Sequence, residues 1–206
     1  MEIVLATRNR NKLREFREML QDLQVHVRSC DDFPDCPDAL EDGNSFAENA
    51  LKKARLVAAH AGLLAIADDS GLEVDALGGQ PGIYSARYGG VQGDDLRNIK
   101  KLLHELDGVP RERRGAQFRC VIAIVAPEGR EQIVEGLCRG VIIEQPRGTG
   151  GFGYDPVFLD EPSQLTFAEM DAGQKNSISH RARAVQKLKK ILPAFMKHNK
   201  IQNNFG

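Results

Sequence analysis

Two adjacent carboxylates, Asp68 and Asp69, follow a short apolar run at residues 63–67 that predicts a buried strand. In open α/β sheets, ligand sites lie beyond the carboxyl ends of strands, and neighbouring carboxylates repel each other unless a cation lies nearby. Mg²⁺ usually takes one or two protein carboxylates, and Glu41 is a candidate second ligand that must lie within about 10 Å of Asp69. The pair indicates a metal or catalytic site, against the alternative that residues 69–71 only form a turn.

The loop at residues 7–12 leads from an expected strand, Glu2–Thr7, into an expected helix, Lys12–Leu23. The start of a helix offers backbone N–H groups and the positive end of the dipole, which suits phosphate. The GxxxxGK[ST] pattern of a P-loop is absent from the sequence, and the alternative is ordinary helix capping beside a surface lysine. The candidate phosphate-binding residues are Thr7, Arg8, Asn9, Arg10, Asn11 and Lys12.

A glycine-rich segment at residues 148–156 reads Gly-Thr-Gly-Gly-Phe-Gly-Tyr-Asp-Pro. Its letters match GxGxxG, but that dinucleotide-binding motif must open a helix, and Pro156 disfavours helical geometry at Asp155. The segment predicts a loop that presents Phe152 and Tyr154 to a flat ligand, with Asp155 accepting hydrogen bonds. The alternative is a simple turn whose aromatic rings pack in the core.

Basic residues mark the start of the last expected helix, where Lys175 is followed by Ser179, His180 and Arg181. Cationic side chains at a helix N-terminus oppose the dipole, which is unfavourable unless they recruit an anion or a carbonyl group. The alternative is ordinary polarity of the protein surface. A GxSxG nucleophile motif is absent, so the sequence gives no support to a hydrolase with a serine nucleophile.

Hydrophobic spacing predicts the elements that position these residues. Ser45 and Glu48 match a capping box at the start of a helix that Gly62 closes. Helices mixed with parallel-like and hairpin strands predict the α/β class with a mixed sheet. The other expected elements are strands at 118–126 and 132–143 joined by a turn at 127–129, a helix that carries Leu96, Ile99, Leu103 and Leu106, and a last helix from about Ser179 that Pro193 kinks or ends.

Composition predicts a globular protein of one large domain. The chain has 206 residues, of which 41% are apolar and 28% charged, and its formal net charge is -1. That balance argues against a protein that mainly binds nucleic acid or an anionic membrane, because both need a cationic excess. We expect one domain over residues 1–198 and a mobile tail at 199–206.

The sequence also predicts a cytoplasmic protein with reduced cysteines. Its longest apolar run, 120–126, is far shorter than the roughly 20 residues that cross a bilayer, and its first residues do not resemble a signal peptide. Cys120 and Cys138 could face each other across the expected hairpin. We nevertheless expect buried free thiols at Cys120 and Cys138, and reduced thiols at Cys30 and Cys36 as well.

Taken in order, these segments resemble the inosine triphosphate pyrophosphatase family, which are non-standard purine nucleoside triphosphate diphosphatases of the dITP/XTP type. The resemblance covers nearly the whole chain. One departure is Arg8, where the family often has glycine. The matching residues are 6–9 with Lys12, 41–43 with Phe46, 48–50, Lys53 and Ala54, 67–72, 81–87, 151–156, Lys175 and 179–181.

The resemblance implies an elongated mixed sheet flanked by helices, two lobes with a central nucleotide-binding cleft, and a homodimer. It also implies cleavage between the α- and β-phosphates, with Mg²⁺, to a nucleoside monophosphate and pyrophosphate. Glu41 and Asp69 would hold the metal, and Asp69 would accept the proton of the attacking water. Thr7, Asn9, Lys12 and Lys53 would hold the triphosphate, and the base and sugar would contact Phe152, Gly153, Tyr154, Asp155, Lys175, His180 and Arg181, with Ser70 nearby.

The residues themselves agree with this chemistry. Phosphoryl transfer needs positioning and charge neutralisation more than a covalent nucleophile, although Asp68 could share either task of Asp69. A buried donor that faces O6 of hypoxanthine or xanthine loses its partner with adenine, at a cost of about 1–3 kcal/mol. The alternatives are a Maf-like pyrophosphatase acting on pyrimidine or modified nucleotides, and a nucleotide-binding regulator without turnover.

Overall fold

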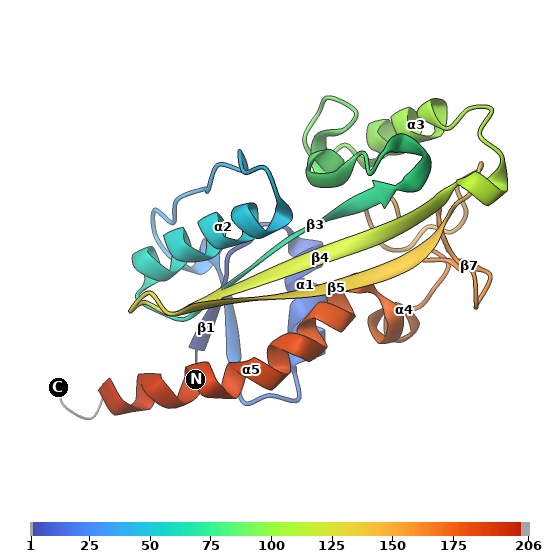
Figure 1. The fold of residues 1–206 in the computed structure, drawn as a ribbon. Helices are drawn as coiled ribbons and strands as arrows, with labels where there is room; N and C mark the ends of the chain where they lie inside the picture. Colours follow the sequence, from blue (N-terminus) through green and yellow to red (C-terminus); the bar gives the residue numbers. More distant parts are fainter. Residues whose placement is uncertain (1, 203–206) are drawn as a thin grey trace. The chain divides into compact units, whose positions relative to one another are not determined.

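Seven strands form one mixed sheet in the order β2-β1-β3-β4-β5-β6-β7 in the computed structural model, which describes residues 2–202, with side chains through residue 196 (Figure 1). β1 pairs in parallel with β2 and β3, whereas β6 pairs antiparallel with β5 and β7, which confirms the expected α/β class. The strands are β1 (Glu2–Leu5), β2 (His26–Ser29), β3 (Ala65–Val74), β4 (Gly115–Val125), β5 (Glu131–Ile142), β6 (Phe158–Asp160) and β7 (Leu165–Thr166). The helices are α1 (Arg10–Leu20), α2 (Phe46–Ala61), α3 (Asp95–Glu105), α4 (Ala172–Ile178) and α5 (His180–Gln202).

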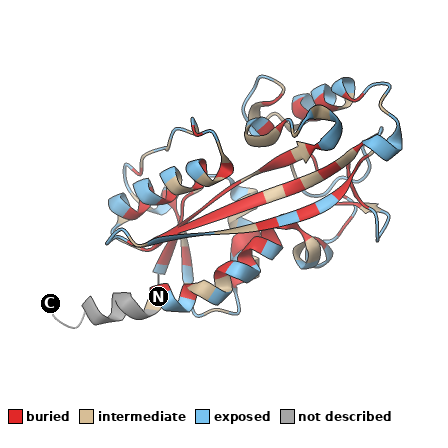
Figure 2. Ribbon diagram, in the orientation of Figure 1, coloured by how far each residue is buried: buried red, intermediate tan, exposed pale blue. Residues whose placement is uncertain are grey.

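The chain divides into two compact units. Unit 1 takes in the described residues of 1–69, 121–136 and 182–206, and unit 2 takes in 70–120 and 137–181. Buried residues concentrate on the strands, while the outward faces of the helices are exposed (Figure 2). The single domain over 1–198 and the two lobes with a cleft stay predictions.

Local sequence signals set the limits of α2 in unit 1. Ser45 caps the helix by accepting a hydrogen bond from the backbone N of Glu48 at 3.2 Å, as expected. The Glu48 carboxylate reaches back to the N–H of Asn44 rather than to that of Ser45. Gly62 ends the helix with φ of 64°, a left-handed conformation that favours glycine. The helix packs against β1.

The strand β3 is longer than expected. It continues through Asp68 and Asp69 to Val74. The alternative of a turn at residues 69–71 is therefore wrong, and so is the expectation that the strand ends at Ala67. The neighbouring strand β1 ends at Leu5, which pairs with Ile66. The two carboxylates therefore lie just past the carboxyl end of β1, not of β3, beside the point where the chain turns into α1.

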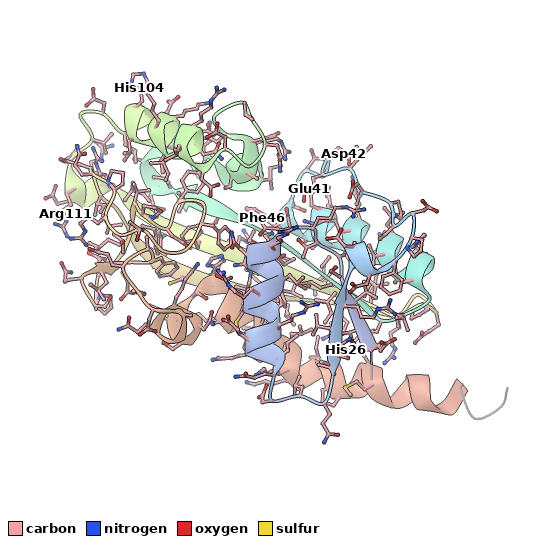
Figure 3. All side chains as sticks on the ribbon, turned by 180° about the vertical axis from the view of Figure 1, so that it is seen from behind. His26, Glu41, Asp42, Phe46, His104 and Arg111 are labelled. Atoms are coloured by element: carbon pink, nitrogen blue, oxygen red, sulfur yellow. The ribbon has the colours of Figure 1, made fainter. Side chains whose placement is uncertain are left out.

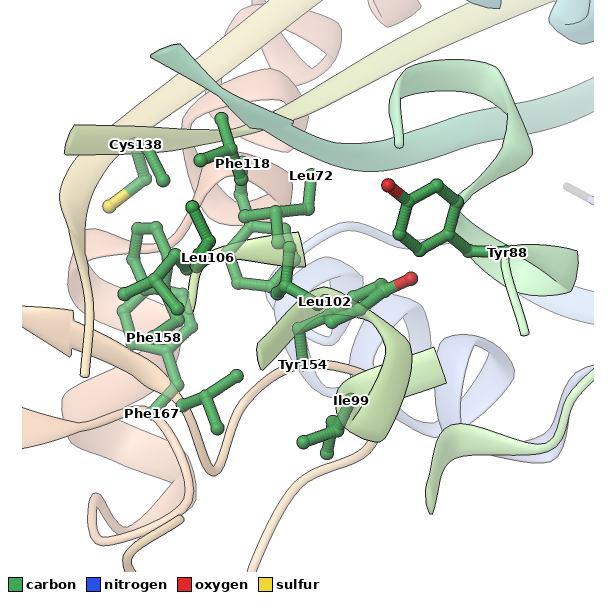
Figure 4. Close-up of a cluster of buried hydrophobic side chains, with 14 of the residues drawn as sticks. Leu72, Tyr88, Ile99, Leu102, Leu106, Phe118, Cys138, Tyr154, Phe158 and Phe167 are labelled. Atoms are coloured by element: carbon green, nitrogen blue, oxygen red, sulfur yellow. The ribbon is translucent and has the colours of Figure 1, made fainter. Parts of the chain in front are cut away.

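The core of unit 2 is built around aromatic rings (Figure 4). Phe118 lies 4.6 Å from Phe158 and 5.7 Å from Phe167, measured between ring centroids. The helix α3 packs on this core. Its buried face includes Leu102, which was not predicted, and excludes Leu96, which is 81% exposed. Ile99 and Leu106 lie on the buried face as predicted, and Leu103 is partly buried against it.

The last helix does not end at Pro193. α5 begins at His180, one residue after the expected Ser179, and continues to Gln202, so residues 199–202 of the expected mobile tail are helical and residues 203–206 lie outside the described part of the chain. Arg130 supports the helix beyond the proline by donating hydrogen bonds to the main-chain oxygens of Ala194 and Phe195. No helix in the described part of the chain has the length and apolar character needed to cross a bilayer. All four cysteines are free thiols, as predicted, and Cys30 and Cys36 are buried as well as Cys120 and Cys138.

Candidate active site

Carboxylates and lysines from four segments meet in unit 1. Lys53, on α2, donates from Nζ to Glu41 Oε1 at 2.8 Å and to Asp69 Oδ1 at 3.0 Å. It also donates to the main-chain oxygen of Asp68 at 2.8 Å. Because both carboxylate oxygens contact one nitrogen atom, they lie less than about 6 Å apart, which meets the limit of about 10 Å expected for a shared Mg²⁺ site. Glu41 reaches this cluster from the loop that precedes α2 (Figure 3).

The second lysine of the cluster comes from the first turn of α1. Lys12 Nζ lies 3.1 Å from Asp68 Oδ2, and the Asp68 side chain is 0% exposed. Asn9 caps the same helix, since its Oδ1 accepts hydrogen bonds from the backbone N of Asn11 and of Lys12. Thr7 Oγ1 accepts in turn from the backbone N of Asn9. The alternative of ordinary capping is thus confirmed for Asn9, but Lys12 is a largely buried ion-pair partner rather than a surface lysine.

Opposite charges alternate in this cluster. The carboxylates of Asp68, Asp69 and Glu41 contact the ammonium groups of Lys12 and Lys53. Burial raises the pKa of Asp69, and the nearby charges of Lys53 and Lys12 partly offset that rise. Burial opposes the charged form of Lys53, but Asp69, Glu41 and Asp68 outweigh it and raise the lysine pKa. Carboxylate oxygens are the ligands that Mg²⁺ prefers, so the donor set fits a divalent cation.

Arg8 contacts a neighbouring loop. Its guanidinium pairs with Asp31 at 2.6 Å and with Asp38 at 2.8 Å, and it donates to the main-chain oxygen of Cys36 at 2.8 Å. These contacts tie residues 31–38 to the end of β1. Arg10, also predicted to bind phosphate, is exposed at the start of α1.

In unit 2, the expected base-binding residues form a second buried charged cluster. Lys175 Nζ contacts Asp155 Oδ2 at 2.7 Å, and both side chains are almost fully buried. The same carboxylate oxygen accepts a hydrogen bond from the backbone N of Phe152 at 2.9 Å. A Cβ at Gly151 would collide with this oxygen, so glycine is required there. Lys175 lies 4.9 Å from the ring centroid of Phe152, which is partly exposed.

Tyr154 packs in the core, which was the alternative to its facing a ligand. Its ring is 3% exposed and packs in the hydrophobic core of unit 2, and its hydroxyl donates to the main-chain oxygen of Ser85 at 2.9 Å (Figure 4). Burial is the main cause that raises the pKa of this hydroxyl. Of the two aromatic residues predicted to face a ligand, Phe152 is therefore the accessible one.

His180 and Arg181 are buried in the first turn of α5, so ordinary surface polarity is wrong for both. The His180 ring stacks on Phe118 with the centroids 4.7 Å apart. Arg181 is 2% exposed, donates from Nη2 to Ser70 Oγ at 2.9 Å, and places its guanidinium 5.7 Å from the ring centroid of Phe152. Lys175 and Arg181 thus both approach Phe152.

Comparison with known proteins agrees with this arrangement. A model of the family described as the Ham1 family matches residues 3–191. The chain belongs to the Ham1 family. A dITP/XTP pyrophosphatase of Desulforamulus reducens is 51% identical over 98% of this chain and 100% of its own, and one of Bacillus licheniformis is 51% identical over 93% and 97%. Among solved structures, a HAM1 protein from Coxiella burnetii has a TM-score of 0.85 at 42% identity, and the Staphylococcus aureus Ham1 protein has 0.84 at 40%; each comparison covers 94% of this chain and 99% of the other.

Sequence reasoning missed one buried side chain in this Ham1 protein. Asn49 donates from Nδ2 to Asp69 Oδ2 at 3.2 Å and accepts from the backbone N of Gly43 at 2.8 Å. A Cβ at Gly43 would lie 2.6 Å from Asn49 Oδ1, so this contact requires glycine. The available signal was spacing, because Asn49 and Lys53 are four residues apart and share one face of α2.

Proposed function

We propose that the chain is a nucleoside triphosphate pyrophosphatase that hydrolyses non-standard purine triphosphates (dITP, ITP and XTP) to the monophosphate and pyrophosphate. Relatives named dITP/XTP pyrophosphatase match it over nearly its whole length at about half identity. The observation that carries the proposal is the convergence of Glu41, Asp69 and Lys53 within hydrogen-bond distance. Removing these nucleotides from the cellular pool is the role that follows.

The start of α1 would receive the triphosphate. Thr7 and Asn9 line this turn, and Lys12 and Lys53 bring two positive charges from separate helices. The positive end of the helix dipole adds to the attraction for phosphate. Asn11 would contribute through its backbone and Arg10 through its exposed charge, while Arg8 acts by holding residues 31–38.

Glu41 and Asp69 would hold Mg²⁺, which when bound offsets phosphate charge and polarises the phosphorus under attack. We assign proton abstraction from the attacking water to Asp69. Both carboxylates are paired with a lysine, but the Asp68 side chain is 0% exposed and that of Asp69 is 10% exposed, so Asp68 is less accessible to a water molecule. A raised pKa makes the Asp69 carboxylate a stronger base than an exposed aspartate. Asn49 holds Oδ2 of Asp69 and Lys53 holds Oδ1, so the orientation of the carboxylate is fixed from both sides.

The purine would bind against the Phe152 ring. Lys175 and Arg181 lie close to this ring, and each can donate a hydrogen bond to an acceptor such as O6. Adenine presents an amino group at that position, so the donor would lose its partner at a cost of about 1–3 kcal/mol. Gly153, Asp155 and His180 would shape the pocket, and Tyr154 would anchor it through Ser85. Ser70 would hold Arg181 in place.

We also propose that the enzyme is a cytoplasmic homodimer that binds neither nucleic acid nor membrane. The dimer follows from the family resemblance. The near-neutral net charge of -1 supports the absence of a polyanionic partner. Gel filtration with light scattering would report a mass twice that of one chain if the dimer is correct, and a single-chain mass if it is not.

A panel of nucleotides tests the proposed activity. With Mg²⁺ present, pyrophosphate release from dITP, ITP and XTP is expected to be about five- to 150-fold faster than from ATP, because adenine leaves the donor that faces O6 without a partner. GTP keeps O6, so slower release from GTP would have to come from rejection of its 2-amino group. Release from dTTP or UTP instead would support the Maf-like alternative. Binding of ITP in calorimetry without any product would support the non-catalytic regulator, and equal rates with ATP and ITP would contradict the base selectivity.

A further inference from the structure

A carboxylate outside the expected site contacts the glycine loop, which we define as residues 148–155. Asp95, in the first turn of α3, accepts a hydrogen bond at Oδ2 from the backbone N of Gly153 at 2.7 Å. This is a short hydrogen bond to a charged acceptor, of the stronger kind. We propose that Asp95 is a positioning residue that holds the glycine loop in the conformation that binds the purine base. The inference rests on the proposed assignment of this loop to base binding.

The backbone of the glycine loop needs contacts from outside to hold one conformation. Gly148, Gly151 and Gly153 have φ angles of 79°, 71° and 62°, in the left-handed region where glycine moves freely. Glycine loses more conformational freedom on ordering than any other residue. Part of that entropic cost would otherwise fall on nucleotide binding, and a preformed loop avoids it.

Asp95 acts directly beside the ring that faces the ligand. The N–H of Phe152 is held by Asp155, and the next N–H along the chain, that of Gly153, is held by Asp95. The peptide groups on both sides of Phe152 are thus each fixed by a carboxylate. In this conformation of the loop, Lys175 and Arg181 both lie close to the Phe152 ring.

A second contact ties the same loop to the same part of unit 2. The Tyr154 hydroxyl donates to the main-chain oxygen of Ser85, ten residues before Asp95. Asn98, one turn further along α3, accepts from the N–H of Gly89 and donates to the main-chain oxygen of Ala86. Hydrogen bonds thus connect residues 85–98 to one another and to the glycine loop, and Asp95 provides the carboxylate that contacts this loop.

The neighbouring aspartate offers a matched control. Asp94 caps α3 by accepting from the backbone N of Arg97 at 3.0 Å, and its carboxylate also pairs with the Arg97 guanidinium at 3.1 Å. Asp94 thus stabilises the helix, and Asp95 contacts the loop. Replacing each by alanine separates the two roles, because alanine is a good helix former at the position of Asp95.

The experiment compares D95A, D95N and D94A. For D95A we expect a KM for dITP raised about tenfold, which equals 1.4 kcal/mol, with kcat changed less than about twofold and the melting temperature nearly unchanged. In the protein without nucleotide, the Gly153 amide proton resonance should move upfield and exchange faster with solvent. D95N keeps a neutral acceptor and should fall between D95A and the unaltered protein. D94A should lower the melting temperature and leave KM and the Gly153 resonance unchanged.

Phe152→Ala separates failure of this inference from failure of the base-site assignment. If F152A raises KM while D95A leaves both KM and the Gly153 resonance unchanged, the positioning role is overturned and the base site stands. If D95A shifts the Gly153 resonance but neither variant changes KM, the contact is real but the loop does not bind the base. That second result overturns the inference together with the assignment on which it rests.

Discussion

Asp69→Asn is expected to lower kcat for dITP by about 100- to 10,000-fold, the range typical of a lost general base. The amide cannot take the proton of the attacking water, and it carries no charge to hold a divalent cation. Asparagine has the size of aspartate, and its one amide oxygen can still accept from either Lys53 or Asn49, so the fold should survive. Pyrophosphate release under saturating dITP measures the effect, and a thermal melt verifies the fold.

Asp68→Asn is the control for that assignment. It removes the charge that pairs with Lys12 and should weaken phosphate binding, seen mainly as a higher KM. Near-normal turnover in D69N combined with a collapse of kcat in D68N would move the role of base to Asp68. A large loss of kcat in both variants would mean that the adjacent carboxylates act as one unit.

Asp155→Ala is expected to reduce the free energy of unfolding by about 3–5 kcal/mol, the usual cost of removing one partner of a buried ion pair. The change removes the carboxylate that balances the Lys175 ammonium at 2.7 Å. It also takes away the acceptor of the Phe152 N–H, so the glycine loop loses an internal hydrogen bond. Urea denaturation, followed by circular dichroism, measures the loss.

The double variant D155A/K175M provides the control. Because it removes both charges, it should recover a large part of the stability lost in D155A, while nucleotide binding stays impaired. If D155A reduces the free energy of unfolding by less than about 1 kcal/mol, the pair contributes no more than an exposed surface ion pair does, which would contradict its proposed importance.

Local signals predicted much of the fold, and long-range pairing explains what they missed. Ser45 and Gly62 act within a few residues of themselves, so the limits of α2 could be predicted from sequence. The segment Asp68-Asp69-Ser70-Gly71 has poor strand propensity, yet β3 runs through it beyond the end of β1, with β4 as its neighbour on the other side. Strand propensity depends on such context, which hydrophobic spacing does not contain.

The same division applies to the site. The carboxylates and lysines of unit 1 were predicted to gather, and the structure brings Glu41, Asp69 and Lys53 together. Asn49 and Asp95 escaped prediction because their partners are 20 and 58 residues away and their residue types are common on helices. The sequence also left open whether the aromatic rings of the glycine loop face a ligand or the core, which the packing around Tyr154 decided.

Binding of Mn²⁺, a spectroscopic substitute for Mg²⁺ that takes the same oxygen ligands, tests the central claim most directly. Electron paramagnetic resonance would titrate the metal into the unaltered protein, E41Q and D42N. Asp42 is the matched control because its carboxylate pairs with Lys52, whereas that of Glu41 pairs with Lys53. The proposed site predicts that E41Q binds Mn²⁺ at least about tenfold more weakly, a loss of 1.4 kcal/mol, while D42N binds as the unaltered protein does. Equal affinity in E41Q and the unaltered protein would contradict the assignment of the metal to Glu41 and Asp69.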